Sequence, residues 1–179
     1  MAVRQILPAS NPLLRQKAQK VKRFDNSLQK LVDDMVETMH AANGLGLAAP
    51  QIGVSLQVIV VWLPPETDEE GRVVRGEKLY TLVNPEIVKA SPETVVGEEG
   101  CLCMPHYYGQ VRRAAAVIVK GRNLQGKEVK IKGNGLLARA LQHEVDHLHG
   151  KLFLDRLESL ESLHYVEPKS KEDTAEPGL

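Results

Sequence analysis

The sequence has little cysteine, no net charge and no long apolar run, and each shortage excludes a class of protein. Its two cysteines, Cys101 and Cys103, are separated by one residue, a spacing that is poor for a disulfide, so a disulfide-stabilised scaffold is excluded. Lys plus Arg and Asp plus Glu both number 23, and this balance does not indicate nucleic acid or an anionic membrane surface as the main partner. The chain has neither the ~20 apolar residues of a membrane span nor a signal-peptide core, so we expect a cytoplasmic protein.

The composition that is present is typical of one globular domain. The chain has 179 residues, of which 42% are hydrophobic and 26% are charged, enough for a substantial apolar core. We expect residues 1–165 to form the folded domain and residues 166–179, which are polar and contain two prolines, to be a disordered tail. Residues 1–24 contain six basic and no acidic residues, as a transit peptide would, but interspersed prolines and apolar residues favour packing against the domain.

Hydrophobic spacing predicts two helices with several strands between them. Apolar residues recur at helical intervals over residues 26–42 and 135–149, and glycines follow both segments. The polar stretch 64–78 is expected to be a solvated loop or a hairpin tip. Strands bracketed by one early and one late helix favour an α+β domain over alternating βαβ units. The predicted strands cover residues 56–63, 79–83, 86–90, 94–97, 111–120 and 127–132.

The second predicted helix carries the strongest chemical signal, the run His143-Glu144-Val145-Asp146-His147. Histidines four residues apart lie on one helix face, where both imidazoles can reach one metal ion, and the glutamate beside them can take a proton from metal-bound water. The motif lies among apolar residues such as Leu141 and Leu148, and polar groups buried there need a strong partner. A chance match on a surface helix is the alternative, and the apolar setting argues against it.

The residues after this motif do not fit the common zinc proteases. A metzincin site needs a glycine three residues after the second histidine and a third histidine three residues after that glycine. Gly150 is present, but Phe153 occupies the position of the third histidine. A thermolysin-like site needs a downstream glutamate from a further helix, and the remaining chain is short. The downstream glutamates are Glu158, Glu161 and Glu167. A third ligand from upstream is therefore the better candidate.

Cys101 and Cys103 are the upstream residues whose soft donor atoms suit such a site. One thiolate and two imidazoles leave a fourth position for water, which is the mark of a catalytic metal site. A closed structural site with four protein ligands is the alternative, and it would need Cys103 or His106 as an additional ligand. Gly100, which precedes the pair, would let the backbone approach closely.

Three segments together resemble the signature motifs of the peptide deformylases. They are Gly44-Leu45-Gly46-Leu47-Ala48-Ala49-Pro50-Gln51, Glu99-Gly100-Cys101-Leu102 and Gln142-His143-Glu144-Val145-Asp146-His147. Members of that family are metal-dependent hydrolases that remove the formyl group from the N-terminal formylmethionine of newly made polypeptides and release formate. Residues 1–165 would then be a deformylase-like catalytic domain. We accordingly expect an α+β fold with antiparallel β-sheets packed around a central metal-binding helix and a second helix near the N-terminus.

The resemblance also implies a role for each matching residue. Glu144 would be the general base, and the side-chain amide of Gln51 and the backbone N–H of Leu102 would stabilise the developing oxyanion. The usual metal of the family is ferrous iron, so we expect one divalent ion, Fe²⁺ first, with Zn²⁺ or another divalent ion able to take its place. The metal ligands would be Cys101, His143 and His147.

On the substrate side, the resemblance implies N-formylmethionyl nascent peptides as partners and, as in some members, the ribosome. Gly46 would offer its backbone to the bound peptide. Leu45 could line the pocket for the methionine side chain together with Leu136 and Ala140, although a plain core role is an equally good interpretation of each.

The sequence departs from the family pattern in three places. Cys103 stands where the second motif commonly ends in serine, which makes the choice between the two cysteines less automatic. A basic residue that helps some members bind the peptide backbone is missing near Tyr107 and Tyr108. The stretch 64–78 and the tail 166–179 have no assigned counterpart.

Overall fold

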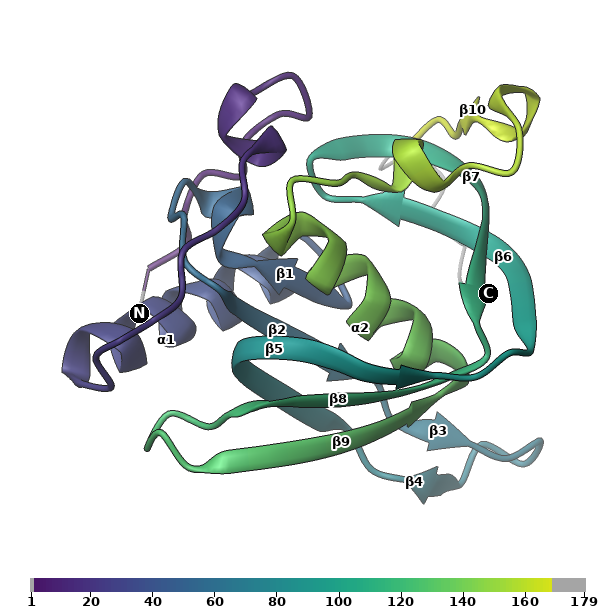
Figure 1. The fold of residues 1–179 in the computed structure, drawn as a ribbon. Coiled ribbons are helices and arrows are strands. Elements are labelled where there is room, and N and C mark those ends of the chain that lie inside the picture. The colour runs from purple at the N-terminus through teal and green to yellow at the C-terminus, as the bar shows by residue number, and fades with distance from the viewer. Residues whose placement is uncertain (1, 169–179) are drawn as a thin grey trace, which may run out of the picture.

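The computed structural model describes residues 2–168, which form two α-helices and two main antiparallel sheets (Figure 1). The five-stranded sheet has the order β1-β2-β5-β8-β9, the three-stranded sheet has the order β10-β7-β6, and β3 pairs with β4 in a separate ribbon. The predicted α+β class, with antiparallel sheets and an N-terminal helix, is confirmed. The elements are α1 (Asn26–Ala41), α2 (Gly135–Leu148), β1 (Gly46–Ala48), β2 (Val58–Leu63), β3 (Glu66–Thr67), β4 (Val73–Arg75), β5 (Lys78–Ala90), β6 (Thr94–Cys101), β7 (Met104–Ala114), β8 (Ala116–Arg122), β9 (Glu128–Asn134) and β10 (His164–Tyr165).

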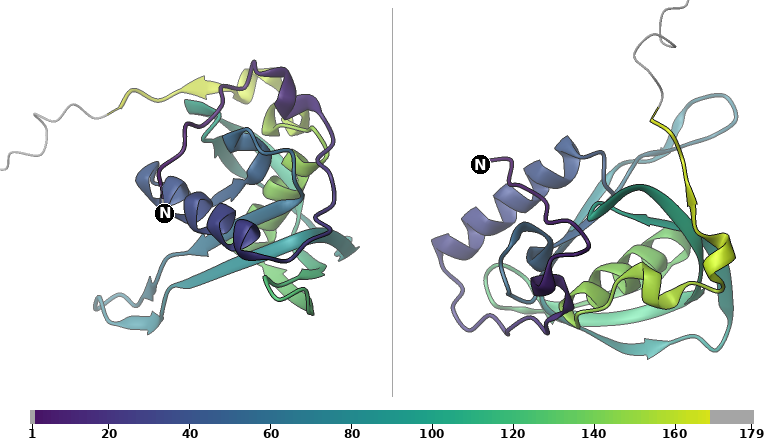
Figure 2. Two further views of the ribbon diagram at one scale, coloured as in Figure 1. Left: turned by 90° about the vertical axis from the view of Figure 1, so that its left-hand side faces the viewer. Right: turned by 90° about the horizontal axis from the view of Figure 1, so that it is seen from above.

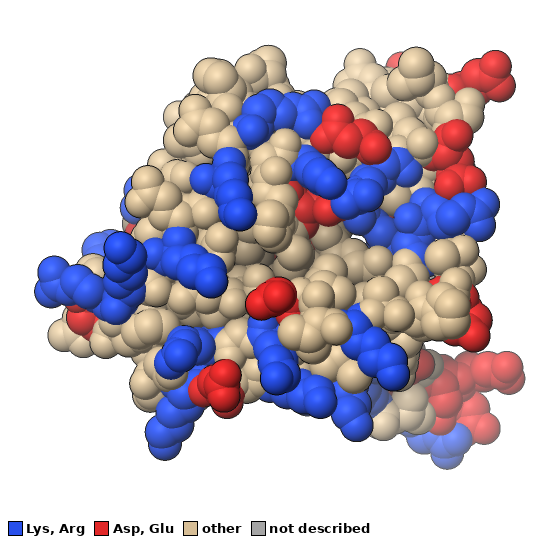
Figure 3. All heavy atoms as spheres, viewed as in Figure 1, with Lys and Arg blue, Asp and Glu red and all other residues tan. Residues whose placement is uncertain are grey.

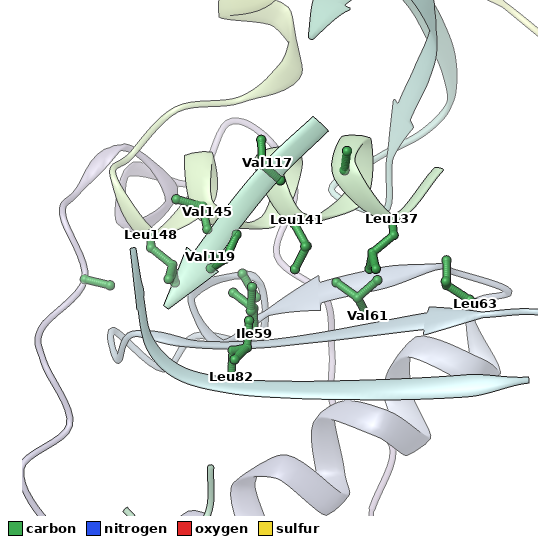
Figure 4. Close-up of a cluster of buried hydrophobic side chains, with 13 residues drawn as sticks. Ile59, Val61, Leu63, Leu82, Val117, Val119, Leu137, Leu141, Val145 and Leu148 are labelled. Atoms are coloured by element: carbon green, nitrogen blue, oxygen red, sulfur yellow. The ribbon is translucent and has the colours of Figure 1, made fainter. Parts of the chain in front are cut away.

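The five-stranded sheet is covered on both faces, which explains the unbroken apolar run of β2. Successive strand residues point to opposite faces, so Ile59 and Val61 pack in the cluster that contains α2, while Val58 and Val60 pack in the cluster that contains α1. Figure 4 shows the first cluster, in which Leu137, Leu141, Val145 and Leu148 of α2 point toward the sheet.

The opposite side of α2 faces the three-stranded sheet through polar contacts. The Gln142 amide group donates to the Ala114 carbonyl at 3.0 Å and accepts from the Ala114 N–H at 3.1 Å. Arg139 donates to the backbone carbonyls of Val95 at 2.8 Å and Val111 at 2.9 Å. Helix α2 therefore runs between the two sheets, as the views from the front and from above show (Figures 1 and 2).

The strand boundaries correct the sequence prediction in several places: β1 was not predicted, β6 extends beyond the predicted 94–97 to Cys101, and β7 begins at Met104. The predicted strands 79–83 and 86–90 are one strand, β5, with a register shift after Val83, where Asn84 takes a positive φ of 52°. The predicted strand 111–120 is wrong: the chain leaves the three-stranded sheet at Ala114 and enters the five-stranded sheet at Ala116. β-like composition continues across this break, so composition alone does not reveal it. The stretch 64–78 contains the β3–β4 ribbon, in agreement with the predicted hairpin.

The N-terminal segment packs against the domain, as predicted. Leu14 and Ala18 are buried, and Gln19 forms a bridge with Leu56 at the start of the sheet region. At the other end of the chain, the Val166 N–H donates to the His106 carbonyl at 2.8 Å. Most of the predicted disordered tail, residues 169–179, lies outside the described residues. Within residues 2–168, no helix is both long and apolar enough to cross a membrane.

The net charge is zero, but the charged side chains are distributed unevenly over the surface. On the face shown in Figure 3, basic side chains gather over β8 and β9, and acidic ones gather toward the right-hand edge. Lys120 and Lys130 lie opposite each other across these two strands, and both are exposed.

Candidate metal centre and substrate pocket

The structure brings three predicted ligands together where α2 passes the end of β6. Helical spacing places His143 and His147 on one face of α2, and Cys101 is the last residue of β6. One ligand atom from each of the three residues lies within 4.8 Å of the others, and the Cys101 Sγ is 3.3 Å from the His147 Nε2. A thiolate and two imidazoles at this separation suit a divalent cation.

The orientation of His143 is fixed by a carboxylate behind it. The His143 Nδ1 is 2.9 Å from the Glu99 Oε2, and a carboxylate only accepts, so Nδ1 carries the hydrogen and Nε2 keeps its lone pair for the centre. Glu99 is buried, and it also accepts two hydrogen bonds from Arg113, at 2.9 and 3.0 Å, and one from Arg139 at 2.9 Å. Burial alone would raise the pKa of Glu99, but the hydrogen bonds from His143 and Arg113 outweigh it and bring the pKa to about 2.

A second buried carboxylate extends this network across α2. Asp146 accepts from Arg113 at 2.6 Å and from Arg156 at 2.9 and 3.1 Å. Burial opposes ionisation of Asp146, but the two arginines lower its pKa below the ordinary value. Arg113 thus joins both carboxylates and ties α2 to β7. We did not predict this network from the sequence. The one signal for it in the sequence was the presence of charged residues within otherwise apolar strand and helix patterns.

Glu144 lies beside the ligands without a fixed partner. The side chain is buried, and its Oε2 atom makes no hydrogen bond within the described part of the chain. Burial raises the pKa of Glu144 to about 7. Its other oxygen lies against Gly46, where an added Cβ would come within 2.3 Å of Oε1. A carboxyl group of near-neutral pKa is suited to accepting and returning a proton.

The metal-binding protonation states of two of the three ligands depend on a bound cation. Burial opposes the charged form of His143, but its hydrogen bond to Glu99 and the neighbouring carboxylate charges outweigh burial and raise its pKa above the ordinary value. The adjacent Cys103 thiol and burial both raise the pKa of Cys101 well above its ordinary value, so its ligating thiolate form needs a positive charge close by. Burial lowers the pKa of His147 well below its ordinary value, which favours the neutral imidazole that binds metals. The donor set therefore fits the divalent ion expected for these residues.

Gln51 approaches the same centre from the turn after β1. It is fully buried, and its Oε1 accepts from the Ala48 N–H at 2.7 Å. Its Nε2 faces the two sulfur atoms, 3.4 Å from Cys103 and 3.6 Å from Cys101. The predicted oxyanion donor is thus placed next to the predicted ligands.

A pocket of about 470 Å³ opens onto the centre. Its walls come from β1, β6, the segment after Cys101 and the face of α2 that carries His143 and Glu144. Both β1 and β6 are edge strands of their sheets, so each has one side whose backbone groups are not paired with another strand of the sheet. The residues predicted to bind the substrate or to take part in catalysis are all part of the lining: Leu45, Gly46, Gln51, Leu102, Leu136, Ala140 and Glu144.

Two other ligand candidates, Glu158 and His106, are engaged elsewhere. Phe153, at the metzincin histidine position, is buried and stacks on the His143 ring. Glu158 pairs with Arg112 at 2.7 Å, and His106 packs against Tyr165 at the pocket rim. Among residues 2–168, the group that could hold a metal contains Cys101 but not Cys103 or His106.

Comparisons with known proteins place the chain in one family. Residues 3–163 match the family model described as "Polypeptide deformylase". The chain is 52% identical over 176 residues to a peptide deformylase of Thermomicrobium roseum, covering 98% of this chain and 97% of that protein. It is 47% identical over 168 residues to one of Dehalococcoides mccartyi, with 94% of both chains covered.

Solved structures give the same result. The peptide deformylase of Ehrlichia chaffeensis in complex with actinonin aligns with a TM-score of 0.82 and 42% identity, covering 90% of this chain and 92% of that chain. The Met-Ala-Ser-bound class I type b enzyme of Acinetobacter baumannii aligns with a TM-score of 0.78 and 39% identity, covering 87% and 99%. The chain therefore belongs to the polypeptide deformylase family of metallohydrolases, which remove the formyl group from the N-terminal methionine of new polypeptides.

Proposed function

We propose that Cys101, His143 and His147 hold one divalent cation in this protein and that Glu144 is the general base for deformylation. The observation that carries the proposal is the convergence of the three donor atoms within 4.8 Å of one another. The unpartnered, buried carboxyl of Glu144 beside them adds the group that the hydrolysis needs. On this basis α2 is the central metal-binding helix of the fold.

When bound, the cation would supply Lewis-acid activation of water and of the formyl carbonyl. Glu144 takes a proton from the attacking water and later delivers it to the amine that leaves the formyl carbon. The near-neutral pKa of Glu144 supports both roles because neither protonation state is strongly disfavoured. The Glu99 carboxylate holds the His143 ring in the ligating orientation.

Charge that develops on the formyl oxygen is stabilised by Gln51 and Leu102. The Gln51 Nε2 is the donor because its Oε1 already accepts from the Ala48 N–H. The backbone N–H of Leu102 is the second donor that we propose, since Leu102 follows the cysteine ligand directly and lines the pocket. Donors fixed in place before the reaction cost no reorganisation when the charge forms.

The peptide lies extended between the edges of β1 and β6. Backbone groups of Gly46 on one edge and Gly100 on the other are available for pairing with an extended chain. The methionine side chain enters the apolar part of the pocket formed by Leu45, Leu136 and Ala140. The Met-Ala-Ser peptide bound by the Acinetobacter baumannii enzyme is the product that formyl-Met-Ala-Ser would give.

Fe²⁺ is the metal that we propose for the native protein, with Zn²⁺ as the alternative, because a thiolate and two imidazoles accept both. Contact with the ribosome and a cytoplasmic location stay predictions.

The activity is tested with protein purified without oxygen, loaded with Fe²⁺ or Ni²⁺, and given formyl-Met-Ala-Ser. We expect stoichiometric formate and Met-Ala-Ser, and no internal cleavage of an unformylated peptide. Cleavage of the unformylated peptide without formate release would favour a metalloprotease and overturn the proposal.

The ligand assignment is tested by two matched variants. Cys101→Ser should lower metal affinity and formate release by more than the roughly 10–100-fold that loss of a group behind a ligand costs, whereas Cys103→Ser should keep one metal per chain. Equal metal loss in both variants would overturn the choice of Cys101.

A further inference from the structure

Cys103 is a buried thiol that the proposed mechanism does not use. It is 4% exposed and packs with Leu14 and Leu152; Cys101 borders the same cluster, but Cys103 is not a member of the proposed ligand group. Its backbone is fixed as well, since its carbonyl accepts from the Ala9 N–H at 2.8 Å. Its Sγ therefore has a defined position, held by the N-terminal segment and by the chain after α2.

Within the described residues, this sulfur is the nearer of the two acceptors that the Gln51 amide nitrogen contacts. The Gln51 Nε2 is 3.4 Å from the Cys103 Sγ and 3.6 Å from the Cys101 Sγ, and the Ala48 N–H fixes the other end of the amide at Oε1. A primary amide has two N–H donors that diverge in one plane. When one N–H is held by Cys103, the direction of the other is set.

We propose that Cys103 is a positioning residue for the oxyanion donor: its Sγ accepts one N–H of Gln51 and thereby aims the second N–H at the reacting formyl oxygen. This inference rests on the role proposed above for Gln51. Without that acceptor only the Ala48 N–H still restrains the amide, whose terminal torsion is soft, and the donor is less well aligned. The simpler interpretation treats Cys103 as a small apolar side chain that fills the core.

The two interpretations differ in their response to Cys103→Ser and Cys103→Ala. Serine keeps an acceptor at nearly the same place, whereas alanine removes it. We expect Cys103→Ser to keep kcat for formyl-Met-Ala-Ser within about threefold, and Cys103→Ala to lower kcat about tenfold with little change in KM. The loss is a fraction of the 10²–10³ that removal of an oxyanion donor costs. Equal kcat in the two variants would overturn the proposal.

A double-mutant cycle with Gln51→Ala separates this inference from the proposed function. If Cys103 acts through Gln51, Cys103→Ala should have no further effect on kcat in the Gln51→Ala background. A full tenfold loss in that background would overturn the positioning role and leave the role of Gln51 intact. If Gln51→Ala alone leaves kcat unchanged, the oxyanion role and this inference both fail.

Two further measurements guard against a structural explanation. Metal content by elemental analysis should stay at one ion per chain in every Cys103 variant, since Cys103 is not in the ligand group. Val119→Ala removes buried volume from the fully buried core under α2, and it should lower the urea midpoint without lowering kcat. A kcat loss in Val119→Ala as large as that in Cys103→Ala would show that packing alone accounts for the effect.

Discussion

Replacing Glu99 with glutamine tests the charge network behind the metal centre. The change keeps the shape of the side chain but removes its charge, and it places an amide group among donors from Arg113, Arg139 and His143. Removing one partner of a buried ion pair costs about 3–5 kcal/mol. Because Arg113 keeps Asp146 as a partner, we expect the lower end, about 3 kcal/mol.

The pKa of Glu99 gives the same magnitude by a separate route. Its fall from 4.5 to about 2 corresponds to about 3 kcal/mol of preference for the ionised form in the folded protein. The variant should also bind metal about 10–100-fold more weakly, because His143 loses its orienting carboxylate. Urea unfolding of the metal-free protein measures the first effect, and Zn²⁺ competition with a chelator measures the second.

Glu98→Gln is the matched control, because Glu98 is the adjacent carboxylate, is half-exposed and, among residues 2–168, has one ion-pair contact, at 3.4 Å from His164. It should change the unfolding free energy by less than about 1 kcal/mol, as exposed pairs do. If Glu99→Gln changes stability and metal affinity no more than this control, the network does not hold the centre as described.

Three more predictions follow from the same contacts. The folded pKa of Glu99 lies below its ordinary value of 4.5, so the stability that Glu99 contributes is present above pH 4.5 and is lost as the pH falls toward 2. Urea unfolding at pH 6, 4 and 3 should therefore show a steeper loss of stability in wild type than in Glu99→Gln. Parallel curves would contradict this. In Gly46→Ala the added methyl would lie 2.3 Å from the Glu144 Oε1, so the carboxylate must move. Formate release should fall about 100-fold, with an almost unchanged urea midpoint. Unchanged activity would show that Glu144 can be displaced without loss of catalysis. Removing the metal with a chelator should lower stability by about 3 kcal/mol relative to protein in metal at 100 times Kd, as followed by thermal unfolding, and Cys101→Ser should lose most of this difference.

The sequence predicted the elements best where periodicity was strong. Both helices began and ended within a residue of the predicted bounds, because apolar spacing and terminal glycines are local signals. The break at Ala115 was missed because it separates two strands of similar composition that belong to different sheets. The hydrophobic pattern of a strand does not indicate which sheet the strand joins.

The candidate site was predictable in part for the same reason. Helical spacing placed His143 and His147 together, but nothing local distinguished Cys101 from Cys103. Cys101 ends β6 and lies with the histidines, whereas Cys103 lies in the turn before β7 and is buried in the cluster with Leu14. The pairing of Arg113 with Glu99 and Asp146 depends on tertiary contacts between distant elements, which no spacing rule reveals.

The most direct test of the proposed centre compares wild type with Glu144→Gln in metal content and formate release, measured on the same anaerobic samples. Glutamine has nearly the shape of Glu144 but cannot accept the proton from water. We predict one metal per chain in both proteins and at least a 100-fold loss of formate release in the variant, the scale of general-base catalysis. Full activity in Glu144→Gln, with its metal retained, would contradict the assignment of Glu144 as the base.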